Sequence, residues 1–176
     1  MDKKIVLING SGGSGKDTFV SFCNNYVEVE SISTVGKVKE AAKILGWTGG
    51  KTEKDRLFLS NLKLVWAEYN SGSKEDISQT VYAIDSVCKF TQGPKKLLFI
   101  HVREPKNIEL IKSTFECETL LITSKRIDKI TSNMADANVD KFKYDHVIHN
   151  DGDLEHLMRA AGLFVTYLFP EGEDLV

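Results

Sequence analysis

The sequence predicts an α/β domain of three layers, in which helices cover both faces of a parallel β-sheet. Short runs of consecutive apolar residues alternate along the chain with segments of helical periodicity, as expected when strands are buried on both faces. The first run, Ile5–Ile8, leads directly into the glycine-rich segment 10–15 and then into a helical pattern. With 176 residues, the chain is expected to form one domain (1–176) with a substantial core.

The first half of the chain begins with strands and helices in alternation and then becomes helical. Gly46 is placed to end one helix and Thr52 to cap the next. The apolar face of this second helix is predicted to consist of Leu57, Leu62, Val65 and Trp66. The elements predicted here are strands at 3–9 and 27–33 and helices at 16–25, 35–45, 52–69 and about 74–90.

The second half returns to alternation after Gly93-Pro94, which breaks the preceding helix. A turn at Asn150-Asp151-Gly152 separates the last strand from the closing helix. The elements predicted here are strands at 97–102, 118–123 and 144–149 and helices at 107–115, 125–134 and 154–168.

Three predicted helices in a row, with no strand among them, indicate an insertion at about 35–92 within a core made of about 1–34 and 93–170. Ligands of parallel sheets bind outside the carboxyl ends of the strands. An insertion that leaves this edge is expected to lie above the glycine-rich loop, where a second substrate enters.

The glycine-rich segment matches the Walker A template, in which a glycine and four further residues precede Gly-Lys. Glycines allow successive backbone N–H groups to point at one phosphate, and the helix that follows adds its positive N-terminal end. Lys16 brings a full positive charge to the outer phosphates. The residues expected to bind the phosphates of ATP are Gly10, Gly12, Gly13, Ser14, Gly15, Lys16, Asp17 and Thr18.

Asp17 departs from this template, which has serine or threonine after the lysine to bind Mg²⁺. Carboxylate oxygens suit Mg²⁺, so Asp17 is expected to hold the ion directly or through a water, with the Thr18 hydroxyl nearby. A carboxylate in the first turn of a helix is also favourable without any metal.

Composition limits the partners and the location of the protein. A net charge of −2, with 27% charged residues, predicts binding to neither nucleic acid nor an anionic membrane surface. No leader sequence or membrane span is recognised, and the cysteines Cys23, Cys88 and Cys117 are expected to be reduced core residues of a cytoplasmic protein. The oligomeric state is not indicated.

The remaining motifs separate the classes of phosphate-loop protein. The switch-type GTPase motifs are missing, because segment 124–128 has one residue too many between lysine and aspartate. The apolar strand at 97–100 runs into His101 rather than into the acid of motor-type ATPases. Small size, a helical insertion and few arginines favour a kinase that acts on a small phosphorylated molecule. The four arginines are Arg56, Arg103, Arg126 and Arg159, and arginine matches phosphate oxygens bidentately.

The chain resembles the nucleoside monophosphate kinases (adenylate-kinase-like P-loop proteins), and in particular the phage-type deoxynucleoside monophosphate kinases. Four segments, whose order and spacing span nearly the whole chain, carry the resemblance. They are Gly-Lys-Asp-Thr at 15–18, Lys-Asp-Arg at 54–56 with its continuation to 70, Val-Arg-Glu-Pro at 102–105 with 108–112, and Tyr-Asp-His-Val-Ile-His-Asn-Asp-Gly-Asp-Leu-Glu-His-Leu at 144–157.

The resemblance implies transfer of the γ-phosphoryl group of ATP, with Mg²⁺, to a (deoxy)nucleoside monophosphate. It implies that the insertion binds this acceptor, that Arg56 and Arg103 hold its phosphate, and that Arg126 closes over the transferring group from a short lid at about 124–140. Lys16, Arg103 and Arg126 are then the catalytic residues. From its place in a loop of the insertion, Trp47 is the candidate to stack on the acceptor base.

His101 departs from the resemblance, because the family tends to carry an aspartate before the Val-Arg pair. Two alternatives therefore remain open. The acceptor is another phosphorylated metabolite, such as dephospho-coenzyme A or phosphomevalonate, or the chain is a catalytically weak nucleotide-binding module.

Overall fold

The computed structural model describes residues 3–50, 52–71, 77–126, 139 and 142–170. A five-stranded parallel sheet forms the centre of the molecule, with the strand order β2-β3-β1-β4-β5. Its strands are β1 (Lys4–Asn9), β2 (Val29–Ser33), β3 (Leu97–His101), β4 (Glu118–Thr123) and β5 (His146–His149). Its helices are α1 (Lys16–Cys23), α2 (Gly36–Ile44), α3 (Glu53–Ser71), α4 (Ile77–Gln92), α5 (Pro105–Thr114) and α7 (Leu154–Leu168).

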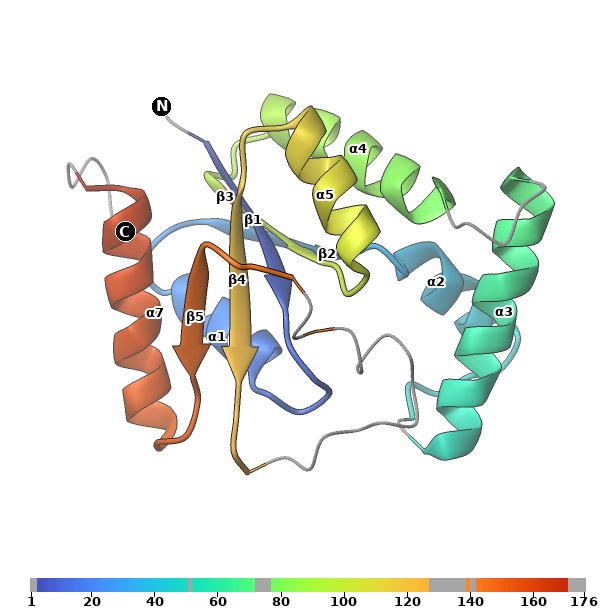
Figure 1. Ribbon diagram of the computed structural model, residues 1–176, viewed down its shortest axis with the longest axis horizontal. Coiled ribbons are helices and arrows are strands. Elements are labelled where there is room, and N and C mark those ends of the chain that lie inside the picture. The colour runs from blue at the N-terminus through green and yellow to red at the C-terminus, as the bar shows by residue number, and fades with distance from the viewer. Residues whose placement is uncertain (1–2, 51, 72–76, 127–138, 140–141, 171–176) are drawn as a thin grey trace.

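Helices cover both faces of this sheet, which confirms the predicted three-layer α/β fold (Figure 1). Alternate residues of the central strand β1 point to opposite faces, so that Val6 and Ile8 pack with α1 and α7, whereas Ile5 and Leu7 pack with α4 and α5. Both sets are buried, which explains why β1 and β3 read as continuous apolar runs.

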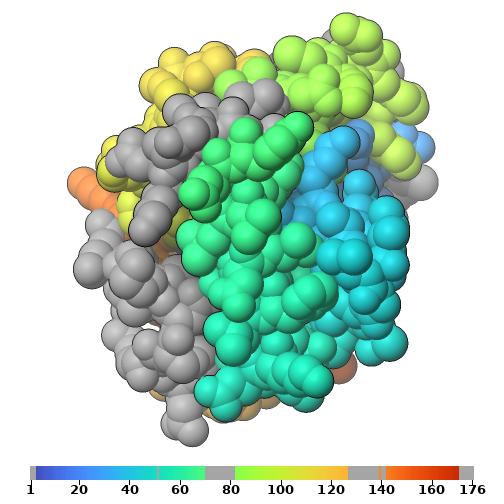
Figure 2. Space-filling view, turned by 90° about the vertical axis from the view of Figure 1, so that its right-hand side faces the viewer, coloured from blue at the N-terminus to red at the C-terminus, as the bar shows by residue number. Residues whose placement is uncertain are grey.

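Helices α2, α3 and α4 all lie between β2 and β3 in the chain, as the sequence predicts. α4 returns to the sheet and packs with α5 on one face, while α2 and α3 extend the molecule beyond the edge strand β2 (Figure 1). From the side, α3 stands across the front of the molecule with α2 next to it (Figure 2).

The apolar face predicted for α3 is wrong in part. Leu57 and Val65 are 62% and 64% exposed, and the buried residue of this helix is Ala67. Helical periodicity detects an apolar stripe but does not say whether another element covers it.

Two further expectations are corrected or fall outside the structure. Cys88 is exposed rather than a core residue, whereas Cys23 is buried, and burial raises the pKa of its thiol to about 12. The helix predicted at 125–134 and most of the lid at 124–140 lie outside the described residues. Among the residues that are described, no helix is both long and apolar enough to span a bilayer.

Candidate functional site

The glycine-rich loop joins the end of β1 to the start of α1, and its backbone needs glycine at defined positions. Gly10, Gly13 and Gly15 have positive φ angles of 147°, 86° and 94°. A Cβ atom at Gly10 would collide with the carbonyl oxygen of Ile122, and one at Gly15 would collide with the side-chain amide of Asn150. The loop is therefore held tightly against the ends of β4 and β5.

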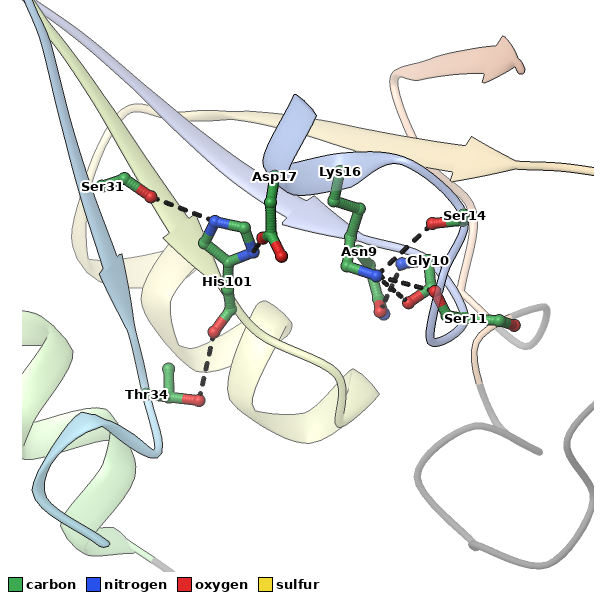
Figure 3. A network of polar contacts seen from close by, with 9 residues as sticks. All are labelled: Asn9, Gly10, Ser11, Ser14, Lys16, Asp17, Ser31, Thr34 and His101. Atoms are coloured by element: carbon green, nitrogen blue, oxygen red, sulfur yellow. Dashed lines mark hydrogen bonds and ion pairs between the residues drawn. The ribbon is translucent and has the colours of Figure 1, made fainter. Parts of the chain in front are cut away.

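Lys16, the first residue of α1, folds back over the loop (Figure 3). Its Nζ donates hydrogen bonds to the carbonyl oxygens of Gly10 (2.6 Å) and Ser11 (2.8 Å) and approaches Ser14 Oγ at 3.4 Å. The α1 N-cap, Gly15, has no side chain to cap the first turn, so backbone N–H groups at this end are open to an anion. A mobile ammonium group thus lies beside backbone donors, which is the combination that holds phosphate.

Asn9, the last residue of β1, connects this loop to the end of β3. It is fully buried, its Oδ1 accepts a hydrogen bond from Gly10 N (2.8 Å), and its Nδ2 donates to the Arg103 carbonyl oxygen (3.1 Å) and to Tyr144 Oη (2.7 Å). These bonds fix the backbone of Arg103 next to the start of the phosphate loop. The half-buried Arg103 is thus placed at the carboxyl edge of the sheet, as predicted.

Asn150, directly after β5, connects the loop to Arg126. Asn150 Nδ2 donates to the Ser14 carbonyl oxygen (3.0 Å), and its backbone N–H donates to the Thr123 carbonyl oxygen (2.7 Å). Arg126 Nη2 donates to the Asn150 carbonyl oxygen (3.0 Å) and approaches its Oδ1 at 3.3 Å. The predicted lid arginine is therefore linked to the phosphate loop through a single intervening residue, Asn150.

His101 is at the end of β3, between the loop and β2 (Figure 3). Its Nε2 shares a hydrogen bond with Ser31 Oγ (3.1 Å), and its Nδ1 lies 3.9 Å from Asp17 Oδ1. Burial lowers the pKa of His101 from 6.5 to about 4, and the charge of Asp17 only partly offsets this. The imidazole is therefore neutral at pH 7.

Three cations contribute to this low pKa and lie around His101. They are Lys16 from the start of α1, Lys39 from α2 and Arg103 beyond β3. Each charge disfavours the protonated imidazole, because like charges repel at short range. Cations from the core and from the insertion thus both act on His101, which lies beside the phosphate loop.

Asp17 and Thr18 fit a Mg²⁺ ion. The Asp17 side chain is 87% exposed on the first turn of α1, and the adjacent Thr18 supplies a hydroxyl oxygen. Among the described residues no group of three or more His, Cys, Asp and Glu side chains is arranged to bind a metal. Mg²⁺ is commonly held by one or two protein oxygens together with substrate phosphates and waters, so a single carboxylate with a hydroxyl is a suitable donor set.

Arg56 lies in the first turns of α3 and is exposed. It precedes Lys63 by seven residues, or two helical turns, so the two side chains share one face of the helix. Lys63 Nζ is 2.6 Å from Glu104 Oε1, immediately after Arg103 in the chain. The contact ties α3 to Glu104 at the start of α5, whereas Arg56 is exposed two turns before Lys63 on the same helix.

Trp47 and Asp55 belong to the structure of the insertion itself. Thr52 caps α3, because its Oγ1 accepts a hydrogen bond from the Asp55 N–H (3.2 Å). The Asp55 carboxylate in turn accepts from the Thr52 hydroxyl (2.6 Å) and backbone N–H (2.9 Å), and these bonds lower the pKa of its carboxyl. The buried indole N–H of Trp47 lies beside this carboxylate without reaching hydrogen-bond geometry. These contacts tie Trp47 to α3, and no contact described in the structure joins it to the phosphate loop.

Three contributors to the site were missed by the sequence analysis. Asn9 had a detectable signal, because a polar residue ends an otherwise apolar strand just before the glycines. Asn150 was assigned to a turn, and only the three-dimensional structure brings it to Ser14. Lys39 has no sequence signal, since a lysine on an amphipathic helix is ordinarily a solvated surface residue.

Comparisons with known proteins establish the fold. No protein-family model matches the chain, and no curated protein matches it in sequence. Among solved structures, shikimate kinase from Bacteroides thetaiotaomicron matches with a TM-score of 0.51 and 13% identity, over 95% of this chain and 98% of that chain. Thymidylate kinase from Ehrlichia chaffeensis matches with a TM-score of 0.50 and 14% identity, over 94% and 99%. A tunicamycin resistance protein from Deinococcus radiodurans matches with a TM-score of 0.53 and 9% identity, over 99% of both chains. The chain therefore has the α/β fold of P-loop kinases.

Proposed function

We propose that this protein is an ATP-dependent kinase that transfers the γ-phosphoryl group to the phosphate of a (deoxy)nucleoside monophosphate. The observation that carries the proposal is a glycine-rich loop with Lys16 folded over it, beside which Asn9 fixes the backbone of Arg103. The loop and Lys16 suit the phosphates of ATP, and Arg103 suits a second phosphate beside them. An acceptor that already bears a phosphate explains why cations lie on both the core and the insertion.

The transfer step needs positioning and charge neutralisation more than a strong base. An anionic oxygen of the acceptor phosphate forms a bond to the γ-phosphorus while the bond to the β–γ bridging oxygen breaks, and ADP leaves with that electron pair. Backbone N–H groups of residues 12–17 and the Lys16 ammonium hold the ATP phosphates. Arg103, Lys39 and Arg56 orient the acceptor phosphate, and neutral His101 does not compete with these cations for it.

Mg²⁺, held by Asp17 and Thr18, would neutralise charge on the β- and γ-phosphate oxygens. Arg126 is proposed to leave the Asn150 carbonyl oxygen and contact the transferring phosphoryl group. An arginine in this role stabilises charge that develops on the equatorial phosphate oxygens. Exclusion of water by the insertion favours transfer over hydrolysis.

The test measures ADP formation from Mg-ATP with each common ribo- and deoxyribonucleoside monophosphate as acceptor. Strong stimulation by one or two of them supports the proposal and identifies the acceptor. The Lys16→Ala variant is expected to lose nearly all of this activity. The Lys89→Ala variant is expected to keep it, because Lys89 forms an exposed ion pair with Asp85 within one helix. Retained activity in Lys16→Ala would contradict the proposed role of the loop.

The acceptor residues are tested by the Arg103→Ala variant. Asn9 binds the Arg103 backbone oxygen, so removal of the side chain leaves that hydrogen bond in place. We expect kcat/KM for the acceptor to fall by about two orders of magnitude, since a charged hydrogen bond to phosphate contributes about 3 kcal/mol, with little change in ATP affinity. An equal loss of ATP binding would assign Arg103 a structural role.

A catalytically weak nucleotide-binding module is the second candidate, and His101 is the observation that favours it. It places a neutral side chain where the resembling family tends to have an acid. ATP binding without transfer to any acceptor would support this candidate. Transfer only to phosphorylated compounds that are not nucleotides would instead show that the protein is a kinase with a different class of acceptor.

A further inference from the structure

Helix α3 carries an exposed apolar stripe on its outer face. Leu57, Leu64, Val65 and Tyr69 are 62%, 51%, 64% and 87% exposed, and Asn61 lies among them. The spacing of four, seven, eight and twelve residues from Leu57 places the four later residues on one side of a helix. Figure 2 shows α3 across the front of the molecule.

The stripe faces away from the candidate site. The opposite side of α3 carries the buried Ala67, and Lys63, which forms an ion pair with Glu104. Nucleotide binding therefore neither uses nor covers the stripe. Large apolar side chains gathered on one exposed helix face commonly mark a protein interface, whereas scattered single ones do not.

We propose that this stripe is the contact surface for a second copy of the chain, with the two α3 helices antiparallel about a two-fold axis at Asn61. In this arrangement residues whose numbers add up to about 122 meet. The two-fold axis then produces two equivalent contacts between Leu57 of one copy and Leu64 of the other. Lys54 lies opposite Glu68 of the other copy, also twice, and the two Asn61 amides meet at the axis.

The charges on this face of α3 favour a second copy of the chain as the partner. Lys54 and Glu68 are both exposed and lie fourteen residues apart, about 21 Å along one helix, so they are too far apart to pair within a chain. They are equidistant from Asn61 and of opposite sign, which is the condition for a self-complementary two-fold surface. A parallel pairing would instead place like charges against each other, which is unfavourable.

The surface predicts a weak dimer. One helix pair forms a contact at the small end of specific interfaces, although Ile44 and Leu45, exposed at the end of α2, add apolar area to the insertion. Contacts of this size and partly polar character are associated with dissociation constants of about 10 µM or weaker. The proposal does not depend on the proposed kinase activity, because it concerns the other side of α3.

Sedimentation velocity of the purified full-length chain, at concentrations up to several times this constant, tests the proposal. The wild-type protein is expected to pass from monomer to dimer. Leu64→Glu is expected to weaken self-association at least tenfold, because it buries a charge against Leu57. The control, Leu163→Glu at another exposed apolar position on α7, is expected to leave it unchanged.

Charge reversal makes the test specific to the antiparallel geometry. Lys54→Glu alone and Glu68→Lys alone are each expected to weaken self-association, since each creates two like-charge contacts. When these two variants are mixed, both contacts in the heterodimer become attractive, so association returns in the mixture. A monomer at all concentrations, a dimer that Leu163→Glu breaks and Leu64→Glu does not, or failure of the mixture to associate would each overturn the proposal.

Discussion

Replacement of His101 by glutamine is expected to remove a pH-dependent loss of stability. In the folded protein, burial and the charges of nearby cations lower the pKa of His101 from 6.5 to about 4. Between these two pH values the unfolded chain binds a proton that the folded chain does not. The free energy of unfolding therefore falls as the pH falls from about 6.5 to about 4, and the full loss is present below pH 4.

The size of this loss follows from the two pKa values. Each pKa unit corresponds to about 1.4 kcal/mol, so a difference of about 2.5 units destabilises the folded protein by roughly 3 kcal/mol at pH 4. The imidazole is only 18% exposed, so water screens little of this effect. A loss of this size is a large part of the total stability of a domain, which is commonly about 5–15 kcal/mol.

The acidic side chains with shifted pKa values do not cause a loss of stability in this pH range. The pKa values of Asp55, Asp145 and Asp151 are all lower than the ordinary value of 3.8. Carboxyl groups of this kind stabilise the fold above pH 3.8, and their contribution is lost only as the pH falls below that value. Between pH 4 and 6.5, the change in the free energy of unfolding therefore reports on His101 rather than on these carboxyl groups.

Urea unfolding followed by circular dichroism from pH 4.5 to 7.5 measures the effect. The wild-type protein is expected to lose stability steadily towards the acidic end, and His101→Gln is expected to lose most of this slope while the glutamine keeps a polar contact for Ser31. His156→Gln, at an exposed position, serves as the control and should keep the wild-type slope. If wild type and His101→Gln show the same pH dependence, the buried, neutral state of His101 is refuted.

Two further variants probe the phosphate loop. Gly10→Ala is expected to destabilise the protein by about 2–4 kcal/mol, because Cβ would collide with the Ile122 carbonyl oxygen at a φ of 147°, and thermal unfolding would show this directly. Asn150→Ala removes the donor to the Ser14 carbonyl oxygen and is expected to weaken ATP binding about tenfold, measured by calorimetry, while a full loss of fold would contradict this local role.

Much of the fold follows from local patterns in the sequence. Leu154–Leu168 was predicted to the residue, because a turn precedes it and its apolar periodicity is strong. β2 was predicted two residues too long at its start, since an edge strand has fewer buried positions and a weaker pattern. The stripe on α3 shows the limit of this approach, because Leu57 and Val65 have the periodicity of a core face and yet are exposed.

The candidate site was predictable where its chemistry is local. The glycines and Lys16 act within one short segment, so their pattern carries the information. Asn150 reaches the loop from the other end of the chain, and Lys39 reaches it from the insertion, so only the packing of distant segments assigns them to the site. For the same reason, the sequence favours Trp47 for base stacking, although its described contacts are with α2 and the start of α3.

Two departures, Asp17 from the Walker A template and His101 from the resembling family, lie next to each other in the structure. The Walker A template has a hydroxyl after Lys16, and the resembling family tends to carry an aspartate at the end of β3, whereas this chain has a carboxylate in the first position and an imidazole in the second. Asp17 Oδ1 and His101 Nδ1 are 3.9 Å apart, so both versions place one carboxylate at nearly the same point. Under the proposed function, Asp17 would therefore supply a carboxylate for Mg²⁺ beside the position where the resembling family tends to carry its acid.

This exchange predicts non-additive effects in a double-mutant cycle measured by Mg²⁺-dependent ADP formation. Asp17→Ser removes the only carboxylate of the pair and is expected to weaken Mg²⁺ dependence strongly, and His101→Asp alone places two carboxylates in contact, whose repulsion raises the pKa of one of them. Asp17→Ser combined with His101→Asp restores one carboxylate and one hydroxyl, and we expect it to recover at least about fivefold over Asp17→Ser alone, because residues in contact couple by about 1 kcal/mol or more. Purely additive losses would mean that the two residues act independently, and that Asp17 has not taken over the role of the missing strand-end acid.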